Sequence, residues 1–249
     1  MSTLTCTFRS YCLSADTTIN VILPDDVHED IPTLYLLHGM HGNFNSWQNK
    51  TSIARYAAKY SIAVVMASAE NSFYCNMKYG YPYYDFFARE LIEFTRKTFN
   101  LSTKREKTFV AGLSMGGYGA IKLALRNPDL FCAGAGLSGC LNINQTVEHA
   151  DFTPILKSIW GEEYKTATKD TEDDLFFLIK NFPEDKPKPR LFIACGTEDF
   201  LIEQNRLFHA LLEGTDFEFE YREGSGAHTW AFWDKWIVPA IKFATQKED

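Results

Sequence analysis

A serine between two glycines is the residue in this sequence best suited to nucleophilic chemistry. Residues 112–116, Gly-Leu-Ser-Met-Gly, follow the apolar run 108–111 and precede a helical-looking segment, 117–127. A strand, the pattern G-x-S-x-G and a helix, in this order, form the context of a nucleophile elbow, whose tight turn exposes the serine hydroxyl. Side chains in place of the two glycines would collide with neighbouring strands. The pentapeptide alone also occurs in ordinary loops, so the flanking elements support the prediction that Ser114 is a nucleophile.

A serine hydroxyl is a poor nucleophile at neutral pH, and it needs a base that a carboxylate orients. Chains with a nucleophile elbow carry these groups in the order Ser, Asp or Glu, His. Two histidines lie late enough in the chain, His209 and His228. His209 sits beside the apolar stripe of a predicted helix, where a structural role is typical. His228 ends a glycine-bearing loop, 224–228, between the last predicted strand and the last predicted helix, and is therefore the predicted base.

The carboxylate is predicted in residues 196–199, Gly-Thr-Glu-Asp, which directly follow the apolar strand 191–195. Asp199 is preferred over Glu198, because G-x-x-D is the usual spacing after this strand and the shorter side chain is commoner in this role. The alternative function of either carboxylate is to cap the helix that begins near Glu203. Asp199 is thus the predicted acid.

The negative oxygen that develops during attack on an ester carbonyl needs two backbone N–H donors. One is predicted at Met115, directly after the nucleophile. The other is predicted at Met40, in the loop His-Gly-Met-His-Gly-Asn of residues 38–43. His38 and His41 lie in the same loop, but no carboxylate stands at ligand spacing from them, so we expect no metal site.

Composition places the chain among ordinary globular proteins. Its 249 residues can bury one large core, and its apolar (45%) and charged (23%) fractions are typical of globular domains. A net charge of −7 makes nucleic acids and anionic membranes poor partners. No apolar run approaches the roughly 20 residues of a membrane span, and the N-terminus lacks the features of a secretory signal. The six cysteines show no C-x-x-C or zinc spacing, so a reduced, cytoplasmic protein is expected.

Continuous apolar runs alternate along the chain with segments of helical periodicity, and this order predicts the fold. Four continuous apolar runs, typical of strands buried on both faces, occupy residues 33–37, 62–67, 108–113 and 191–195. Helical periodicity occurs at residues 47–60, 84–99, 117–127, 203–213 and 230–244. This alternation predicts an α/β fold with a mainly parallel sheet in a single domain, residues 1–249. Residues 3–23, with a break at 14–16, predict an N-terminal antiparallel hairpin.

One stretch, residues 142–188, departs from this alternation. It shows no buried strand pattern, carries dense charge and ends among several prolines. We expect an insertion over the carboxyl edge of the sheet, where open α/β folds bind ligands. This cap segment would either cover the substrate or form a surface excursion without a part in substrate selection.

Aromatic residues are concentrated in two places, residues 73–87 and the three tryptophans Trp230, Trp233 and Trp236. Most of these side chains are expected in the core. The alternative is a stacking wall for an acyl group near His228.

Three segments together resemble a known family. The sequence is similar to bacterial tributyrin esterases, in the esterase D group of α/β-hydrolases, at residues 36–47 (Leu-Leu-His-Gly-Met-x-Gly-Asn and Ser-Trp), 102–107 (Ser-Thr-Lys-Arg-Glu-Lys) and 111–120 (Ala-Gly-Leu-Ser-Met-Gly-Gly-Tyr-Gly-Ala). The group also includes S-formylglutathione hydrolases, feruloyl esterases and the mycolyltransferase antigens. The resemblance covers most of the chain and is weakest in the cap segment.

The resemblance implies an α/β-hydrolase fold and a serine carboxylesterase for short acyl esters that needs no cofactor. It places the nucleophile, acid, base and two oxyanion donors on Ser114, Asp199, His228, Met40 and Met115, in agreement with the choices made from the residues. S-formylglutathione hydrolases usually have a cysteine in the loop after the first central strand. Residues 40–42 contain none, which disfavours that activity.

We therefore predict an esterase that hydrolyses short-chain acyl esters through an acyl-enzyme on Ser114, with a small-molecule ester as its partner. Three alternatives use the same residues: a feruloyl or acetyl-xylan-oligosaccharide esterase, an S-formylglutathione hydrolase-like thioesterase, and an acyl transferase. From another class, an inactive hydrolase-fold binding protein is the alternative, against which the intact set of Ser114, Asp199 and His228 argues. The sequence leaves the physiological ester open and permits a homo-oligomer.

Overall fold

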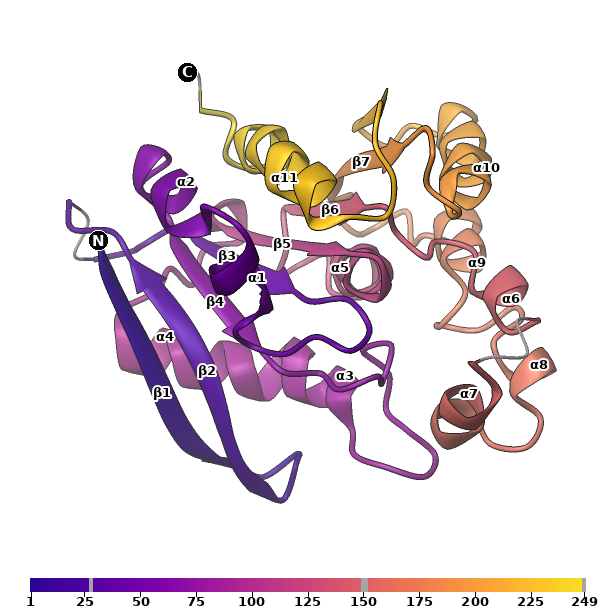
Figure 1. The fold of residues 1–249 in the computed structure, drawn as a ribbon, viewed down its shortest axis with the longest axis horizontal. Coiled ribbons are helices and arrows are strands. Elements are labelled where there is room, and N and C mark those ends of the chain that lie inside the picture. The colour runs from indigo at the N-terminus through magenta and orange to yellow at the C-terminus, as the bar shows by residue number, and fades with distance from the viewer. Residues whose placement is uncertain (27–28, 149–151, 248–249) are drawn as a thin grey trace.

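A single sheet organises the chain. The computed structural model describes residues 1–26, 29–148 and 152–247, in which eight strands form one sheet in the order β1-β2-β4-β3-β5-β6-β7-β8 (Figure 1). The pairs β1–β2 and β2–β4 are antiparallel and every other pair is parallel. The mostly parallel sheet confirms the predicted fold class. The strands are β1 (Ser2–Ser10), β2 (Ala15–Leu23), β3 (Thr33–Leu37), β4 (Ala63–Ala67), β5 (Thr108–Leu113), β6 (Ala133–Leu137), β7 (Arg190–Gly196) and β8 (Phe219–Gly224).

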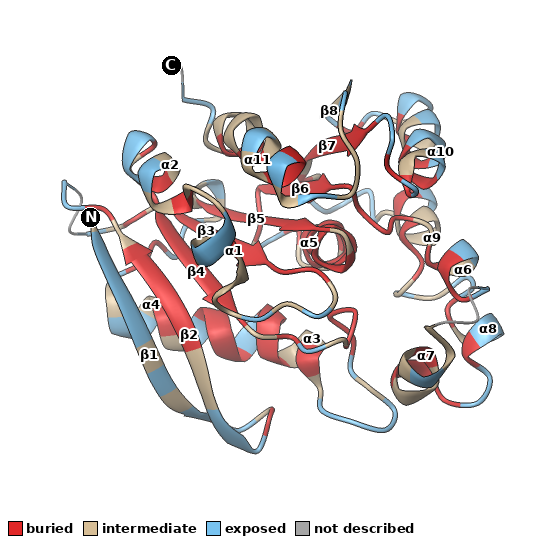
Figure 2. Ribbon diagram, viewed as in Figure 1, coloured by how far each residue is buried: buried red, intermediate tan, exposed pale blue. Residues whose placement is uncertain are grey.

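Helices cover both faces of the sheet. One face carries α1 (Ser46–Lys50), α2 (Ile53–Lys59) and α11 (Trp230–Thr245). The opposite face carries α4 (Leu91–Phe99), α5 (Met115–Arg126) and α10 (Ile202–Glu213). The central strands are buried between these layers, whereas β1 at the edge is largely exposed (Figure 2). No helix in the described part of the chain is long and apolar enough to cross a membrane.

The shorter helical elements complete the chain. The predicted helix over residues 84–99 begins one residue earlier and contains a π-helical turn that the sequence does not indicate. This helix consists of α3 (Tyr83–Asp85), the π-helix η1 (Phe86–Glu90) and α4. The short 3-10 helix η2 (Arg105–Lys107) follows it. The N-terminal hairpin forms as predicted, but its turn occupies residues 11–14, and residues 15 and 16 of the predicted break already belong to β2.

The prediction of one helix over residues 47–60 is wrong, because α1 and α2 are separated at Thr51 and Ser52. Thr51 is extended, with φ of −139° and ψ of 171°. The backbone N–H of Ser52 and the hydroxyl of Tyr56 both donate to Oδ1 of Asp234 on α11, at 2.9 and 3.1 Å. In a continuous helix the N–H of Ser52 would bond within the helix, so the break attaches this segment to α11.

The strand β6 was missed by the sequence prediction. It reads Ala-Gly-Ala-Gly-Leu, and alanine and glycine have low strand propensity. Small residues are needed here because α5 packs closely against the strand. A Cβ on Gly134 would lie 2.7 Å from the Cβ of Ala124, and one on Gly136 would lie 3.4 Å from the carbonyl oxygen of Gly117. Helix packing therefore explains the composition of β6.

The parallel register brings the carboxyl ends of the central strands to one edge of the sheet. Gly112 in β5 pairs with Leu37 in β3 and with Gly136 in β6. The chain leaves β3, β5, β7 and β8 at this same edge, because these strands all run parallel. The loops that carry the predicted site residues therefore begin side by side.

The cap segment, residues 142–188, contributes no strand among its described residues, and residues 149–151 lie outside the described residues. Figure 1 shows the described helices within residues 143–167 grouped at one end of the molecule. Its helices are α6 (Ile143–Thr146), α7 (Thr153–Trp160), α8 (Tyr164–Ala167) and α9 (Leu175–Lys180).

We expect Gly134→Ala to lower the free energy of unfolding by about 1–3 kcal/mol, the usual cost of forcing an extra methyl group into a packed core. The new Cβ would lie 2.7 Å from the Cβ of Ala124. Urea denaturation measures the effect. Gly214→Ala is the control, since the nearest atom to a Cβ there is 3.5 Å away; equal stability of the two variants would contradict the packing argument.

Candidate active site

Ser114 occupies a strained turn between β5 and α5. Its φ of 54° and ψ of −119° form a combination that residues other than glycine rarely adopt. A Cβ on Gly112 would lie 2.3 Å from the carbonyl oxygen of Gly116, and a Cβ on Gly116 would lie 2.5 Å from that of His38. The N–H of Ser114 donates to the carbonyl oxygen of Leu137 at 2.9 Å, which ties the turn to the end of β6. Both glycines are therefore required sterically. Atoms of the neighbouring strand β3 are among those met at each, as predicted, but the nearest contact of Gly112 is with α5.

His228 and Asp199 form a hydrogen-bonded pair. Nδ1 of His228 lies 2.9 and 3.1 Å from the two carboxylate oxygens of Asp199. Asp199 is only 2% exposed, and its Oδ1 also accepts from the N–H of Leu201 at 2.9 Å. Burial alone would raise the pKa of Asp199, but the hydrogen bonds from His228 and Leu201 hold it below its ordinary value. The carboxylate is therefore ionised at neutral pH and accepts the proton on Nδ1, which leaves Nε2 for another partner.

Glu198, the alternative acid, has a different partner. Its carboxylate accepts from the N–H of Gly226 at 2.5 Å, and its own N–H donates to the carbonyl oxygen of Gly226 at 3.1 Å. A Cβ on Gly196 would lie 2.0 Å from that same carbonyl oxygen. Glu198 thus holds the loop that carries His228, whereas Asp199 contacts the imidazole itself.

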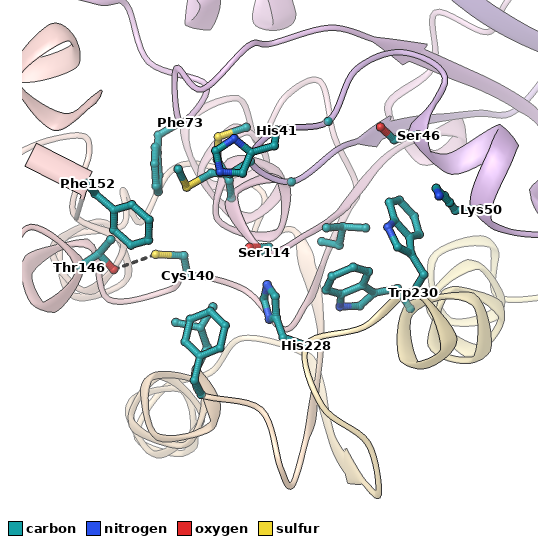
Figure 3. A pocket seen from close by; sticks show the side chains of 18 residues that line it. His41, Ser46, Lys50, Phe73, Ser114, Cys140, Thr146, Phe152, His228 and Trp230 are labelled. Carbon is teal, nitrogen blue, oxygen red and sulfur yellow. Dashed lines mark hydrogen bonds between the residues drawn. The ribbon is translucent and has the colours of Figure 1, made fainter. Parts of the chain in front are cut away.

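Ser114 and His228 face one pocket. Both residues line it, and Figure 3 shows the imidazole of His228 directly below Ser114 in that view. Among the described residues no hydrogen bond joins the two side chains, and such bonds are often long before a substrate binds. The rings of Phe200 and Trp233 lie 4.6 and 4.9 Å from the imidazole, measured between centroids. These two rings restrict the orientation of His228.

His209, the alternative base, has the contacts of a structural histidine. Its ring stacks on Tyr221 with a centroid distance of 4.2 Å and an interplanar angle of 9°. Its Nε2 lies 3.7 Å from Oε1 of Glu213, one helical turn away on α10. It is not among the residues that line the pocket around Ser114.

Two backbone N–H groups beside Ser114 are available to a ligand. Met40 and Met115 both line the pocket. In the described parts of the chain, neither backbone N–H has a hydrogen-bond acceptor. Met115 is also the first residue of α5, so its N–H lies at the positive end of the helix dipole.

His38 shapes the loop that carries Met40. Its Nε2 accepts from the N–H of Ala69 at 2.8 Å, and its Nδ1 lies 2.7 Å from the carbonyl oxygen of Gly39. The proton must therefore be on Nδ1. Burial lowers the pKa of His38 to about 4, so the ring is neutral at pH 7. The sequence pattern around His38 indicated no role other than that of a metal ligand, so the part this ring plays in holding the loop is known only from the structure.

The pocket around Ser114 has a volume of about 570 Å³. Figure 3 shows two groups of side chains on opposite sides of Ser114. One group contains Phe73, Cys140, Thr146 and Phe152, and the other contains Ser46, Lys50 and Trp230. Of the aromatic residues singled out in the sequence, Phe73, Trp230 and Trp233 line the pocket.

Several lining residues were missed by the sequence analysis. Cys140, Thr146, Phe152 and Phe200 carry no recognisable motif, and only the position of Phe200 directly after Asp199 could have indicated it. Thr146 and Phe152 belong to the cap segment, so part of this segment lies beside Ser114.

The arrangement suits acyl transfer through a covalent intermediate. It combines a serine hydroxyl that lines the pocket at a helix N-terminus, an imidazole oriented by an ionised carboxylate, and two N–H donors without acceptors. Within residues 1–26, 29–148 and 152–247, no group of three or more His, Cys, Asp or Glu side chains could hold a metal ion.

Comparisons with known proteins support the same chemistry. Residues 10–244 match the family described as putative esterase. An acetyl esterase of Caldicellulosiruptor saccharolyticus is 33% identical over 269 aligned positions that cover 100% of both chains. Among solved structures, the fluorophosphonate-binding serine hydrolase FphF of Staphylococcus aureus superposes with a TM-score of 0.92 at 33% identity, covering 99% of each chain. The S-formylglutathione hydrolase FrmB of Staphylococcus aureus superposes with a TM-score of 0.88 at 33% identity, covering 98% of each chain.

Acidification should destabilise the protein partly through His38. The unfolded chain protonates His38 near pH 6.5 and the folded protein only near pH 4, so stability falls as the pH drops through this window. At pH 5 this contribution is about 2 kcal/mol, because one pKa unit corresponds to about 1.4 kcal/mol. Urea denaturation at pH 7 and pH 5 gives the free energy of unfolding that each protein loses on acidification. The wild type should lose more than His38→Asn, and the difference is the contribution of His38.

The control for this experiment is His41→Asn, which changes an exposed histidine in the same loop. It should keep the pH sensitivity of the wild type. If His38→Asn loses as much stability on acidification as the wild type does, the buried neutral imidazole is not the cause.

Proposed function

The chain belongs to the esterase family that its sequence matches, and from this premise we propose that Ser114, His228 and Asp199 are the nucleophile, base and acid of its carboxylesterase activity. The protein has the α/β-hydrolase fold and is a serine hydrolase of short-chain carboxylic esters. The observation that carries the assignment is the pocket shared by Ser114 and the His228–Asp199 pair.

In the proposed acylation step, Ser114 Oγ attacks the ester carbonyl while Nε2 of His228 takes its proton. The ionised Asp199 stabilises the imidazolium that forms, because its carboxylate already accepts the proton on Nδ1. The N–H groups of Met40 and Met115 donate to the oxyanion. His228 then returns the proton to the leaving alcohol.

Deacylation repeats this sequence with water as the nucleophile. His228 takes a proton from the water, which attacks the acyl-enzyme, and Ser114 Oγ leaves with the proton that His228 returns. A non-water alcohol could enter at the same place, so acyl transfer differs only in the acceptor. Hydrolysis is favoured because the chain resembles an acetyl esterase along its full length.

The pocket supports a small ester. Its volume of about 570 Å³ and its mostly apolar walls suit a short acyl chain and a compact alcohol. Phe73 and Phe152 bound one side, and we propose that the cap segment takes part in substrate selection through Thr146 and Phe152. A short-chain acyl ester of the acetyl or butyryl type is the proposed substrate.

Two related substrate classes can be distinguished by rate. FrmB is an S-formylglutathione hydrolase with 33% identity to this chain, so S-formylglutathione is the second candidate. Feruloyl and acetyl-xylan-oligosaccharide esters are the third. Comparing kcat/KM on p-nitrophenyl acetate, S-formylglutathione and methyl ferulate ranks these classes directly.

We also propose a cytoplasmic location. All six cysteines are unpaired and four of them are buried, which suits a reducing compartment. The partner is proposed to be a small-molecule ester, and nucleic acids are disfavoured by the net charge of −7.

Ser114→Ala should lower kcat on p-nitrophenyl acetate and butyrate by at least about 1,000-fold, since loss of a nucleophile removes the covalent route. A fluorophosphonate probe should label the wild type and not this variant. Ser158→Ala, which removes a hydroxyl of α7 outside the pocket, is the control and should keep wild-type activity. Activity of Ser114→Ala within about tenfold of the wild type would refute the assignment.

The two carboxylates next to each other in sequence offer a matched pair of variants. Asp199→Asn should lower kcat by about 1,000- to 10,000-fold, because a neutral amide neither enforces the tautomer nor stabilises the imidazolium. Glu198→Gln keeps an oxygen acceptor for the N–H of Gly226 and should change kcat by less than about tenfold. Similar losses in both variants would show that the loss comes from loop disruption and not from the proposed acid.

A further inference from the structure

A cluster of polar side chains behind the pocket has no part in the proposed reaction. At its centre is Lys122 on α5, whose side chain is 0% exposed. Its Nζ donates to Oδ1 of Asp173 at 3.0 Å, to Sγ of Cys75 at 2.9 Å and to the carbonyl oxygen of Phe73 at 3.3 Å. All three donors of the ammonium group are therefore used, and its position is closely defined.

The cluster holds a charged pair. Burial alone would lower the pKa of Lys122, but the charge of Asp173 and the contact with Cys75 raise it above its ordinary value. Burial would raise the pKa of Asp173, which Lys122 and Trp160 nevertheless hold below its ordinary value. The ammonium group also lies 4.8 Å from the ring centroid of Tyr118, a distance at which the aromatic face stabilises a cation.

The cluster connects two parts of the chain. Lys122 and Tyr118 lie on α5, the helix that begins directly after Ser114, whereas Asp173 and Trp160 lie in the cap segment. Trp160 Nε1 donates to Oδ2 of Asp173 at 2.8 Å. The hydroxyl of Tyr118 donates to the backbone carbonyl of Asp173 at 2.7 Å. Asp173 is therefore hydrogen-bonded to α5 through its side chain and its backbone, and to Trp160 of the cap segment through its side chain.

One route leads from the cluster to the pocket through Phe73. The carbonyl of Phe73 accepts from Lys122, and its ring contacts those of Tyr118 and Trp160 at centroid distances of 6.0 and 6.1 Å. The same ring lines the pocket on the side of Phe152 (Figure 3). The Lys122 cluster thus holds both the backbone and the ring of this wall residue.

A second route runs through the cap segment itself. Asp174, next to Asp173, accepts from the side-chain amide of Asn144 at 2.7 Å. Asn144 is part of α6, which ends at Thr146. The hydroxyl of Thr146 lies 2.8 Å from Sγ of Cys140, and both residues line the pocket. Through Asp174 and α6, Asp173 is therefore connected to Thr146 and Cys140, which form a second section of the pocket wall.

We propose that Lys122 is a positioning residue, whose buried bond to Asp173 holds the cap segment against α5 as a rigid wall of the pocket and so limits the size of the ester that binds. The proposal rests on the esterase function proposed above. In this proposal the described part of the cap segment forms a fixed wall of the pocket.

Two variants break the connection by different means. Lys122→Met removes the cation and leaves the Asp173 carboxylate without its main partner. Tyr118→Phe removes only the hydroxyl bond to the Asp173 carbonyl and keeps the ring, so this variant should fold normally. Each variant is assayed for kcat/KM on p-nitrophenyl acetate and hexanoate, and on ethyl and phenyl acetate. Cleavage by subtilisin within residues 142–188 is followed by mass spectrometry.

A loosened wall should accept larger esters. For Lys122→Met we expect the ratio of kcat/KM on the larger ester to kcat/KM on the smaller ester to rise about tenfold, in the acyl or the alcohol series. This is less than the roughly 100-fold change in rate that a 1 Å misplacement can cause. Tyr118→Phe should shift the same ratio by about threefold, in the same direction. Both variants should be cleaved faster than the wild type in the cap segment. Lys122→Met/Asp173→Asn leaves no unpaired charge but still lacks the bond, so the altered preference and the faster cleavage should both remain.

Lys165→Met is the matched control, because it breaks an exposed ion pair to Glu148 within the same segment, at 3.2 Å. It should keep the wild-type size preference and cleavage rate. Wild-type ratios and cleavage rates in Tyr118→Phe and in a folded Lys122→Met would overturn the proposal. A wild type without activity on any of the esters would instead contradict the proposed function, and the cleavage rates would still decide whether the Lys122 cluster holds the cap segment.

Discussion

The close approach of α5 to the sheet is the constraint on which the site depends. A Cβ on Gly116 would lie 2.5 Å from a backbone oxygen of the loop after β3, and one on Gly117 would lie 2.9 Å from the Cα of Gly139. Backbone therefore packs directly on backbone, and the helix can begin at the end of β5 without an intervening loop. This forces Ser114 into its strained conformation and places the N–H of Met115 beside its hydroxyl. The same closeness explains why the neighbouring strand is built of alanine and glycine.

Two histidines near this turn show how burial and hydrogen bonding produce opposite behaviour. His38 accepts an N–H at one ring nitrogen and contacts a carbonyl with the other, and burial keeps the ring neutral, so that it holds the loop of residues 38–43 in place. His228 faces the ionised Asp199 on one side and the open pocket on the other. A positive charge on its ring would be stabilised by that carboxylate. Only the second environment suits a group that gains and loses protons during a reaction.

Local sequence predicted the fold well where a pattern was strong. The buried strands around β5 read as continuous apolar runs, and the family and the α/β-hydrolase fold indicated by the motifs were confirmed by the comparisons. The prediction failed at β6, where packing against α5 overrides strand propensity, and at Ser52, where Asp234 from the far end of the chain breaks a helix. Both failures have one cause, since a contact distant in sequence outweighed the local preference.

The sequence by itself was enough to single out Ser114, Asp199 and His228 as the residues proposed for catalysis, because a nucleophile elbow and the order of its partners can be recognised from local turns and chain order. Spacing and side-chain length favoured Asp199 over Glu198, but only the tertiary structure placed Asp199 against the imidazole and gave Glu198 a different partner, the N–H of Gly226 in the loop that carries His228. It alone placed the cap segment beside the pocket and buried Lys122 behind it. These arrangements depend on which surfaces meet in space, and no pattern along the chain records that.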